Sequence, residues 1–370
     1  MKFLGIDLHS NCFTCCIIYE DEKRFRHSFS FEQESLNKFY QHLDEETHVI
    51  VEASTNTFKF VELIRDKVND VYVANTHKVK AVPMERKKTD KVDAERLAMY
   101  LKMQVLSREM MAKPVYVPEN TIQNLRSLFS TYQLIVKQIV STKNRIHALL
   151  KQNLFPFTKT YIFGKAHREA IQNLEMDEAM SFQIRLLFKA LQQLEDNKKE
   201  LKNKILTVGS EYINEIDIVT SMREISVFMA IALMADIATV ERFPNSKHFT
   251  SYLRSAPGVE SSNETTRITN TNKSGRKLSV ALISQSLNHF RNSNLKLSRW
   301  YDKKAEYANR KGKIRMALCR RVIAELYQML KKQKYHYFRD EKSHQMKMNE
   351  YYKFLERNNI VIQKAALLFS

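Results

Sequence analysis

The chain has 370 residues, and its 60 Lys and Arg against 41 Asp and Glu leave a formal net charge of +19. A basic excess of this size attracts polyanions, so nucleic acid is the first candidate partner and an anionic membrane the second. The apolar run at 225–235 ends at Asp236 and is too short to span a bilayer, which argues against the membrane. We find no signal-peptide pattern, disulfide framework or zinc-ligand spacing, and we expect a cytoplasmic protein whose four cysteines are core residues.

Residues 1–110 have the pattern of an α/β domain. Three β-rich runs follow one another closely, as in an antiparallel meander, and helical and β-rich stretches then alternate. The expected strands are 2–9, 12–20, 25–31, 48–54 and 70–75, and the expected helices are 33–43, 58–68 and one from about Val92. This order predicts a mixed sheet covered by helices.

The middle segment, 111–212, shows two heptad patterns. Apolar residues recur three and four positions apart along 122–150, with Lys143 in one core slot, and again along 184–205, with Lys198 in one slot. Two such helices joined by residues 155–179 should fold back as an antiparallel coiled-coil hairpin. The same stripes could also serve a dimer.

The C-terminal segment, 213–340, is expected to be mostly α-helical, and 341–370 is expected to be a tail. One break interrupts the helical pattern at 255–275, which is rich in Ser, Thr, Asn and Gly. Residues 303–334 then carry eleven Lys and Arg against two acidic residues. That excess predicts a nucleic-acid-binding face.

Four carboxylates in the first domain form a candidate metal site. Asp7 lies inside a β run, Glu52 ends the fourth expected strand, and Asp90 and Asp93 lie three apart at a helix start. Carboxylates that converge repel one another unless cations neutralise them, and divalent ions with oxygen ligands do so. Two metal ions could then activate a nucleophile and stabilise the leaving oxygen of a phosphodiester.

Each of these residues also has a structural interpretation. Asp90 suits a helix cap, Asp93 offsets a helix dipole, and Glu52 could be a surface charge at a strand end. An acidic residue within a β run, as at Asp7, is harder to explain in that way. Basic residues before the helix could contact phosphates or form a solvated loop; they are Lys78, Lys80, Arg86, Lys87 and Lys88.

The motifs GID at 5–7, VEAS at 51–54 and KTDKVDA at 88–94 resemble those of the DEDD transposases of bridge-RNA-encoding insertion sequences, with which the Piv DNA invertases are grouped. The resemblance implies a RuvC-like, ribonuclease-H-like N-terminal domain. By position, the family's acidic residues fall on Asp7, Glu52, Asp90 and Asp93, which would bind Mg²⁺ or Mn²⁺.

The resemblance continues in the C-terminal segment. FPNSKHFTSYLRSAPGVESSNETTR at 243–267 is similar to the motif that carries the family's serine, and an ungapped match from Pro257 places that serine on Ser262, next to Ser261. The further positions that match, or that we assign to DNA binding in the basic helices, are Arg267, Lys273, Arg310, Lys311, Lys313, Arg320 and Arg321. The chain differs from the family at two places where the family has glycines. One is 263–264, and the other is MREIS at 222–226, where the family has a helix-hairpin-helix-like turn.

The resemblance implies a recombinase that cuts DNA and joins it elsewhere, guided by a structured RNA and acting as a dimer or tetramer associated with the nucleoid. Ser262 would be its nucleophile, and the carboxylates and the serine would form one composite site. Two rivals remain open: a Holliday-junction-resolvase-like metal nuclease that uses water, and a non-catalytic nucleic-acid-binding protein.

Overall fold

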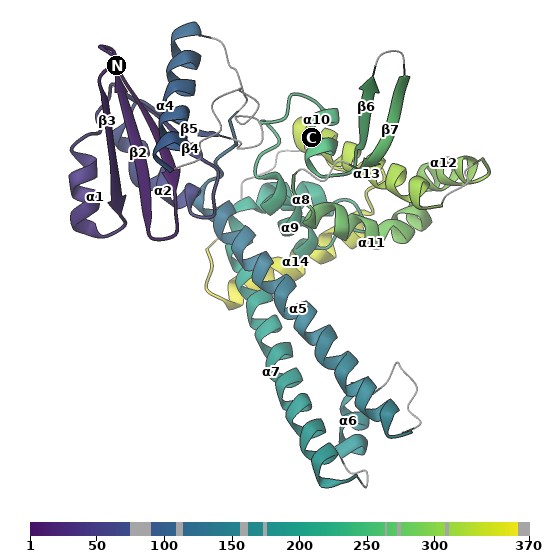
Figure 1. Cartoon of the computed structure of the whole chain (residues 1–370). Coiled ribbons are helices and arrows are strands. Elements are labelled where there is room, and N and C mark those ends of the chain that lie inside the picture. The colour runs from purple at the N-terminus through teal and green to yellow at the C-terminus, as the bar shows by residue number, and fades with distance from the viewer. Residues whose placement is uncertain are drawn as a thin grey trace. The chain divides into compact units, whose positions relative to one another are not determined.

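The computed structural model describes residues 1–74, 90–108, 114–155, 162–172, 176–262, 265–271, 275–307 and 311–361. The chain divides into two compact units, an N-terminal unit of residues 1–119 and a C-terminal unit of residues 120–370 (Figure 1). The sequence had suggested boundaries at 110, 212 and 340.

The N-terminal unit contains a five-stranded mixed sheet, as the sequence predicts. Its strand order is β3-β2-β1-β4-β5. The strands β1 (Lys2–Leu8), β2 (Cys12–Tyr19) and β3 (Arg24–Ser30) form the expected antiparallel meander, while β4 (Thr47–Glu52) and β5 (Asp70–Ala74) join it in parallel. The chain therefore returns to pair β4 with β1 and not with the preceding β3.

Helices cover both faces of this sheet. Alternate residues of each strand face opposite sides, and each side carries an apolar cluster that the helices bury. On one face, α1 (Gln33–Tyr40) and α2 (Thr57–Ile64) pack against a cluster that includes Leu4, Ile6 and Val51. On the other face, α4 (Asp90–Ser107) packs against Phe3 and Ile50 (Figure 1). A short 3-10 turn, Arg65–Lys67, follows α2.

Three of the four cysteines, Cys15, Cys16 and Cys319, are core residues as expected, whereas Cys12 at the start of β2 is only half-buried. Cys15 faces the first cluster and Cys16 faces the second, so the two thiols lie on opposite sides of the sheet. All four cysteines are free, and burial raises the pKa of Cys15 to about 12.

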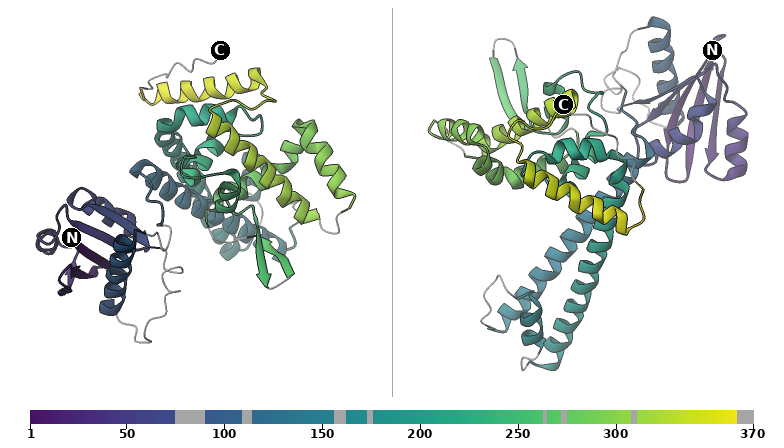
Figure 2. Two further views of the ribbon diagram at one scale, coloured as in Figure 1. Left: turned by 90° about the horizontal axis from the view of Figure 1, so that it is seen from above. Right: turned by 180° about the vertical axis from the view of Figure 1, so that it is seen from behind.

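The expected pair of long helices is present in the C-terminal unit. Helix α5 (Asn120–Gln152) lies side by side with α7 (Glu178–Val208), and the short helix α6 (Lys165–Gln172) lies in their connection (Figures 1 and 2). The pairing is antiparallel, since Ile122 near the start of α5 shares a cluster with Ile205 near the end of α7. Coiled-coil packing of this hairpin stays a prediction.

The rest of the unit is mostly helical, as the sequence indicates. Its helices surround one large apolar cluster to which both ends of the segment contribute. They are α8 (Ile213–Thr220), α9 (Val227–Ile237), α10 (Ser246–Tyr252), α11 (Leu278–Ser293), α12 (Leu295–Ala305), α13 (Lys311–Lys332) and α14 (Glu341–Arg357), with a 3-10 turn at Gly209–Tyr212. Within the described ranges, no helix is both long and apolar enough to cross a membrane.

Two segments have more structure than the sequence suggested. The polar break at 255–275 contains an antiparallel β hairpin, β6 (Pro257–Ser262) and β7 (Thr265–Thr271). Most of the expected tail is helix α14, whose Met348, Tyr351 and Leu355 are buried in the large cluster. The apolar positions of α14 are spaced three and four apart, so burial of that stripe makes it part of the unit's core.

Candidate active site

Asp7 and Glu52 lie at matching positions of two neighbouring parallel strands. Ile6 of β1 pairs with Val51 of β4, and the two acidic residues follow directly. Ile6 and Val51 face the α1 and α2 side, so Asp7 and Glu52 alternate to the side covered by α4. The structure therefore places these two residues at neighbouring positions at the carboxyl ends of their strands.

Helix α4 lies on the same face and begins at Asp90. It approaches β1 closely at Gly5, where an added Cβ would lie 2.1 Å from the carbonyl oxygen of Ala94 and 2.4 Å from the amide nitrogen of Ala98. Asp93 directly precedes Ala94, and Asp7 lies two positions beyond Gly5 on the same face. The part of α4 that directly follows Asp93 is thus held beside the strand that carries Asp7. The side chain of Asp90 lies outside the described residues.

The described carboxylates have protein partners nearby. His9 Nε2 lies 3.6 Å from the Asp7 carboxylate, which is 13% exposed, and Arg96 donates to Asp93 at 3.3 Å. Thr57 donates its hydroxyl to the backbone oxygen of Glu52 at 2.8 Å, which fixes the end of β4. In the part of the chain that is described, no three His, Cys, Asp or Glu side chains are grouped to hold a metal ion. The complete four-carboxylate site therefore stays a prediction.

We expect Gly5→Ala to loosen the packing of α4 against β1 at Ala94 and Ala98, just after Asp93. A methyl group cannot fit against the α4 backbone, and overpacking of this kind costs about 1–3 kcal/mol. Hydrogen–deuterium exchange over residues 90–107 should become faster. Gly312→Ala is the matched control, because no atom lies within 4 Å of a Cβ there. Unchanged exchange in Gly5→Ala would contradict this role of the glycine.

Ser262 is the last residue of β6, opposite Thr265 of β7 in the backbone register. Ser261, the residue before it, pairs with Thr266. Residues 263 and 264, one of the departures from the family glycines, lie outside the described residues. The predicted nucleophile is therefore at the end of a β ribbon, where the sequence suggested a loop.

The base of this hairpin is fastened by a buried carboxylate. Asp236 is fully buried, and it accepts a hydrogen bond from Arg276 Nε at 3.0 Å and two from Ser279, at 2.8 Å from the backbone nitrogen and 2.9 Å from the hydroxyl. Arg276 directly follows Gly275, whose φ of 99° is poorly accessible to other residues. Arg254, just before the hairpin, donates to the Gly275 carbonyl oxygen at 2.6 Å.

This clamp was missed by the sequence argument, which used Asp236 only as the end of an apolar run. A signal was present, because a charged residue that is buried with an apolar run needs a partner of opposite charge or hydrogen-bond donors. No sequence pattern identifies Arg276 as that partner, since the two residues are forty positions apart.

The structure describes the side chains of only four of the basic residues that the sequence assigns to DNA binding. Lys311, Lys313 and Arg321 are exposed on α13, and Arg320 is half-buried. Arg321 lies over the ring of Trp300, 5.4 Å from its centroid. Side chains of the other predicted contacts lie outside the described residues; these are Lys78, Lys80, Arg86, Lys87, Lys88, Arg267, Lys273 and Arg310.

Removing the charges of Lys311, Lys313, Arg320 and Arg321 together should flatten the salt dependence of DNA binding. Each phosphate that the protein no longer neutralises lowers the slope of log K against log salt by about 0.9, because fewer counterions are released. Binding isotherms at several salt concentrations measure this slope. The control removes four charges from the helical hairpin, at the exposed Lys137, Lys189, Lys199 and Lys204. Equal slopes before and after the α13 changes would refute this DNA-binding face.

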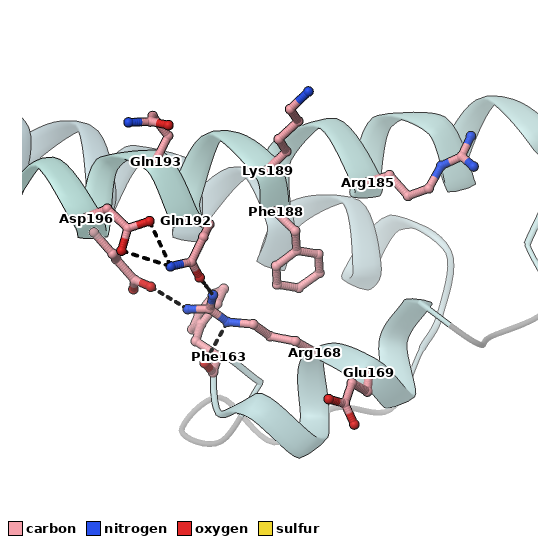
Figure 3. A pocket seen from close by; sticks show the side chains of 10 residues that line it. Phe163, Arg168, Glu169, Arg185, Phe188, Lys189, Gln192, Gln193 and Asp196 are labelled. Atoms are coloured by element: carbon pink, nitrogen blue, oxygen red, sulfur yellow. Dashed lines mark hydrogen bonds and ion pairs between the residues drawn. The ribbon is translucent and has the colours of Figure 1, made fainter.

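An open pocket of about 740 Å³ lies toward the end of the helical hairpin (Figure 3). Arg168 of α6 reaches across it to Gln192 at 3.0 Å and Glu195 at 2.6 Å on α7. Glu195 also pairs with Lys143 of α5 at 3.0 Å. Lys143 is the polar residue within the apolar heptad pattern of α5. Through Glu195 it takes part in a group of ion pairs that joins α5, α6 and α7.

Comparison with known families gives two matches. The model of the IS110 DEDD transposases, described as a transposase, matches residues 4–156, which include all four predicted carboxylates. The model described as the transposase IS116/IS110/IS902 family matches residues 216–297, which include Ser262. No curated protein is found to match the chain. The chain therefore belongs to the IS110-type DEDD transposase family.

Proposed function

We propose that this transposase cuts and rejoins DNA strands with a metal-bound group of four carboxylates and a serine nucleophile. The proposed metal site is supported by one observation: Asp7 and Glu52 lie at matching positions of adjacent parallel strands, on the face that α4 covers. Asp93 and Asp90 begin that helix. The strand order and the helix on this face support the RuvC-like assignment.

The donor set fits a hard divalent cation such as Mg²⁺ or Mn²⁺, because carboxylate oxygens are the ligands such ions prefer. Asp7, Glu52, Asp90 and Asp93 would hold it, and a bound ion would lower the pKa of a hydroxyl nucleophile and stabilise negative charge on the phosphate. Divalent-metal dependence is general among DEDD transposases.

In the proposed reaction, Ser262 loses its hydroxyl proton and its oxygen attacks a DNA phosphorus. The new Ser–O–P bond replaces the bond from phosphorus to one bridging oxygen, which leaves as a DNA hydroxyl carrying a proton. A hydroxyl of the recipient strand then attacks the same phosphorus and releases the serine. One phosphodiester is exchanged for another, so no ATP is needed.

The partners of this transposase would be DNA, a structured guide RNA and further copies of the chain. The net charge of +19 and the exposed cations of α13 support nucleic acid as the ligand. A structured guide RNA and a dimeric or tetrameric assembly rest on the resemblance to the family.

To test this, purified protein is incubated with DNA that carries the ends of its own element, with target DNA, and with RNA transcribed from that element. We expect joined DNA products in Mg²⁺, and none in EDTA or without the RNA. Joining without RNA would remove RNA guidance from the proposal. Nicked but never joined DNA would favour the resolvase-like nuclease.

A further inference from the structure

The turn between α8 and α9 directs three backbone carbonyl oxygens at one point. The ammonium nitrogen of Lys347, on α14, lies 2.8 Å from the oxygen of Thr220, 3.1 Å from that of Met222 and 2.9 Å from that of Ile225. An ammonium group has three N–H donors and no acceptor, so the three carbonyls satisfy it completely.

The turn itself sets this arrangement. Met222 N donates to Val219 O at 3.2 Å and Ile225 N donates to Met222 O at 3.0 Å, so the chain doubles back tightly. Thr220, Met222 and Ile225 are all essentially buried, at 0%, 1% and 0% exposure. Carbonyls at the C-terminal end of a helix carry partial negative charge, and buried ones without a partner are costly. This turn therefore favours a hydrogen-bond donor or a cation at the point where the three oxygens meet.

Lys347 is fixed in place by its own helix. Asp217 of α8 contacts His344 of α14 at 3.0 Å and accepts a hydrogen bond from Tyr335 at 2.6 Å. Asp340 caps the start of α14 through Ser343 N at 3.1 Å. Burial lowers the pKa of Lys347 to about 8, whereas its three carbonyl partners favour the charged form.

We propose that the α8–α9 turn is a monovalent-cation site, of the kind that K⁺ or Na⁺ would occupy, and that this chain fills it with the Lys347 ammonium. Backbone carbonyl oxygens are the ligands with which proteins replace the hydration shell of K⁺. The tethered ammonium makes the fold of the turn independent of the salt in solution. It also makes α14, which lies beyond the second family match at 216–297, a structural part of this unit.

The test compares the thermal unfolding midpoint in KCl and in tetramethylammonium chloride at equal ionic strength, because the larger cation cannot enter the turn. We expect wild type to show the same midpoint in both salts. Lys347→Ala should unfold several degrees lower in tetramethylammonium chloride and regain at least half of that loss in KCl, with a saturating dependence on K⁺. Lys342→Ala, at an exposed position of the same helix, should behave as wild type.

Lys347→Met separates the cation site from simple packing. Its side chain refills the space without a charge, so its midpoint should not respond to K⁺. Equal midpoints of Lys347→Ala in the two salts would overturn the proposal. If Lys347→Ala does not fold in tetramethylammonium chloride, folding on addition of KCl supports the site, and failure to fold at every K⁺ concentration overturns it.

Discussion

Ser262→Ala should abolish both the covalent protein–DNA adduct and the joined DNA product. Removal of the nucleophile in a covalent mechanism leaves only binding and orientation, and such losses reach about 10⁶-fold. Wild-type reactions stopped in detergent should show a slow-migrating, protease-sensitive DNA band, and the Ser262→Ala reaction should not. The alanine removes one hydroxyl at the end of β6, so DNA binding should be retained.

Ser261→Ala is the matched control for this experiment. The two serines are adjacent in the chain, and the ungapped match from Pro257 places the family's serine on Ser262, so Ser261 offers the same hydroxyl one position away from the predicted nucleophile. We expect Ser261→Ala to retain most of the joining activity. Wild-type joining by Ser262→Ala would transfer the role to Ser261 or to water, and an active double variant would leave the resolvase-like nuclease as the explanation.

Asp7→Asn should reduce cleavage and joining by about 10³-fold or more while the fold and DNA affinity remain. The substitution keeps the shape of the side chain but removes the charge that would bind a divalent ion. A metal ion contributes several kcal/mol of transition-state stabilisation, and each 1.36 kcal/mol is a tenfold change in rate. The rate of adduct formation at increasing Mg²⁺ concentration measures the effect.

Asp66→Asn is the control for Asp7→Asn, because Asp66 is an exposed carboxylate in the same unit. It should leave the rate unchanged. The covalent band should be missing from both Asp7→Asn and Ser262→Ala, but only Asp7→Asn should respond to added metal ion. Undiminished cleavage by Asp7→Asn, or full activity of wild type in EDTA, would remove the metal site from the mechanism.

Local patterns in the sequence predicted most elements of the N-terminal unit. Short, nearly continuous apolar and β-rich runs mark β1, β2 and β4, and the position of Asp7 inside such a run placed a carboxylate on a strand. The heptad stripes likewise predicted α5 and α7, because the spacing of apolar side chains is a local property. Motif resemblance added the family, which the two family matches confirm.

At two places the element that forms differs from the one that was predicted from the local pattern of residues. The polar segment at 255–275 lacks the apolar alternation of a strand, yet it forms the β6–β7 hairpin, whose paired backbones supply the regularity that its side chains do not show. Residues 341–370 were expected to be a tail, but Met348, Tyr351 and Leu355 of α14 are buried, and their spacing of three and four is the pattern of a core helix.

The sequence by itself determined which residues carry charge and on which elements they lie. Only the tertiary structure decided that β4 pairs beside β1, that Gly5 admits the backbone of α4, and that Lys347 meets the turn at Thr220. The physical reason is that these contacts join residues far apart in the chain. Their free energy depends on packing and on the closure of long loops, which no pattern of neighbouring residues encodes.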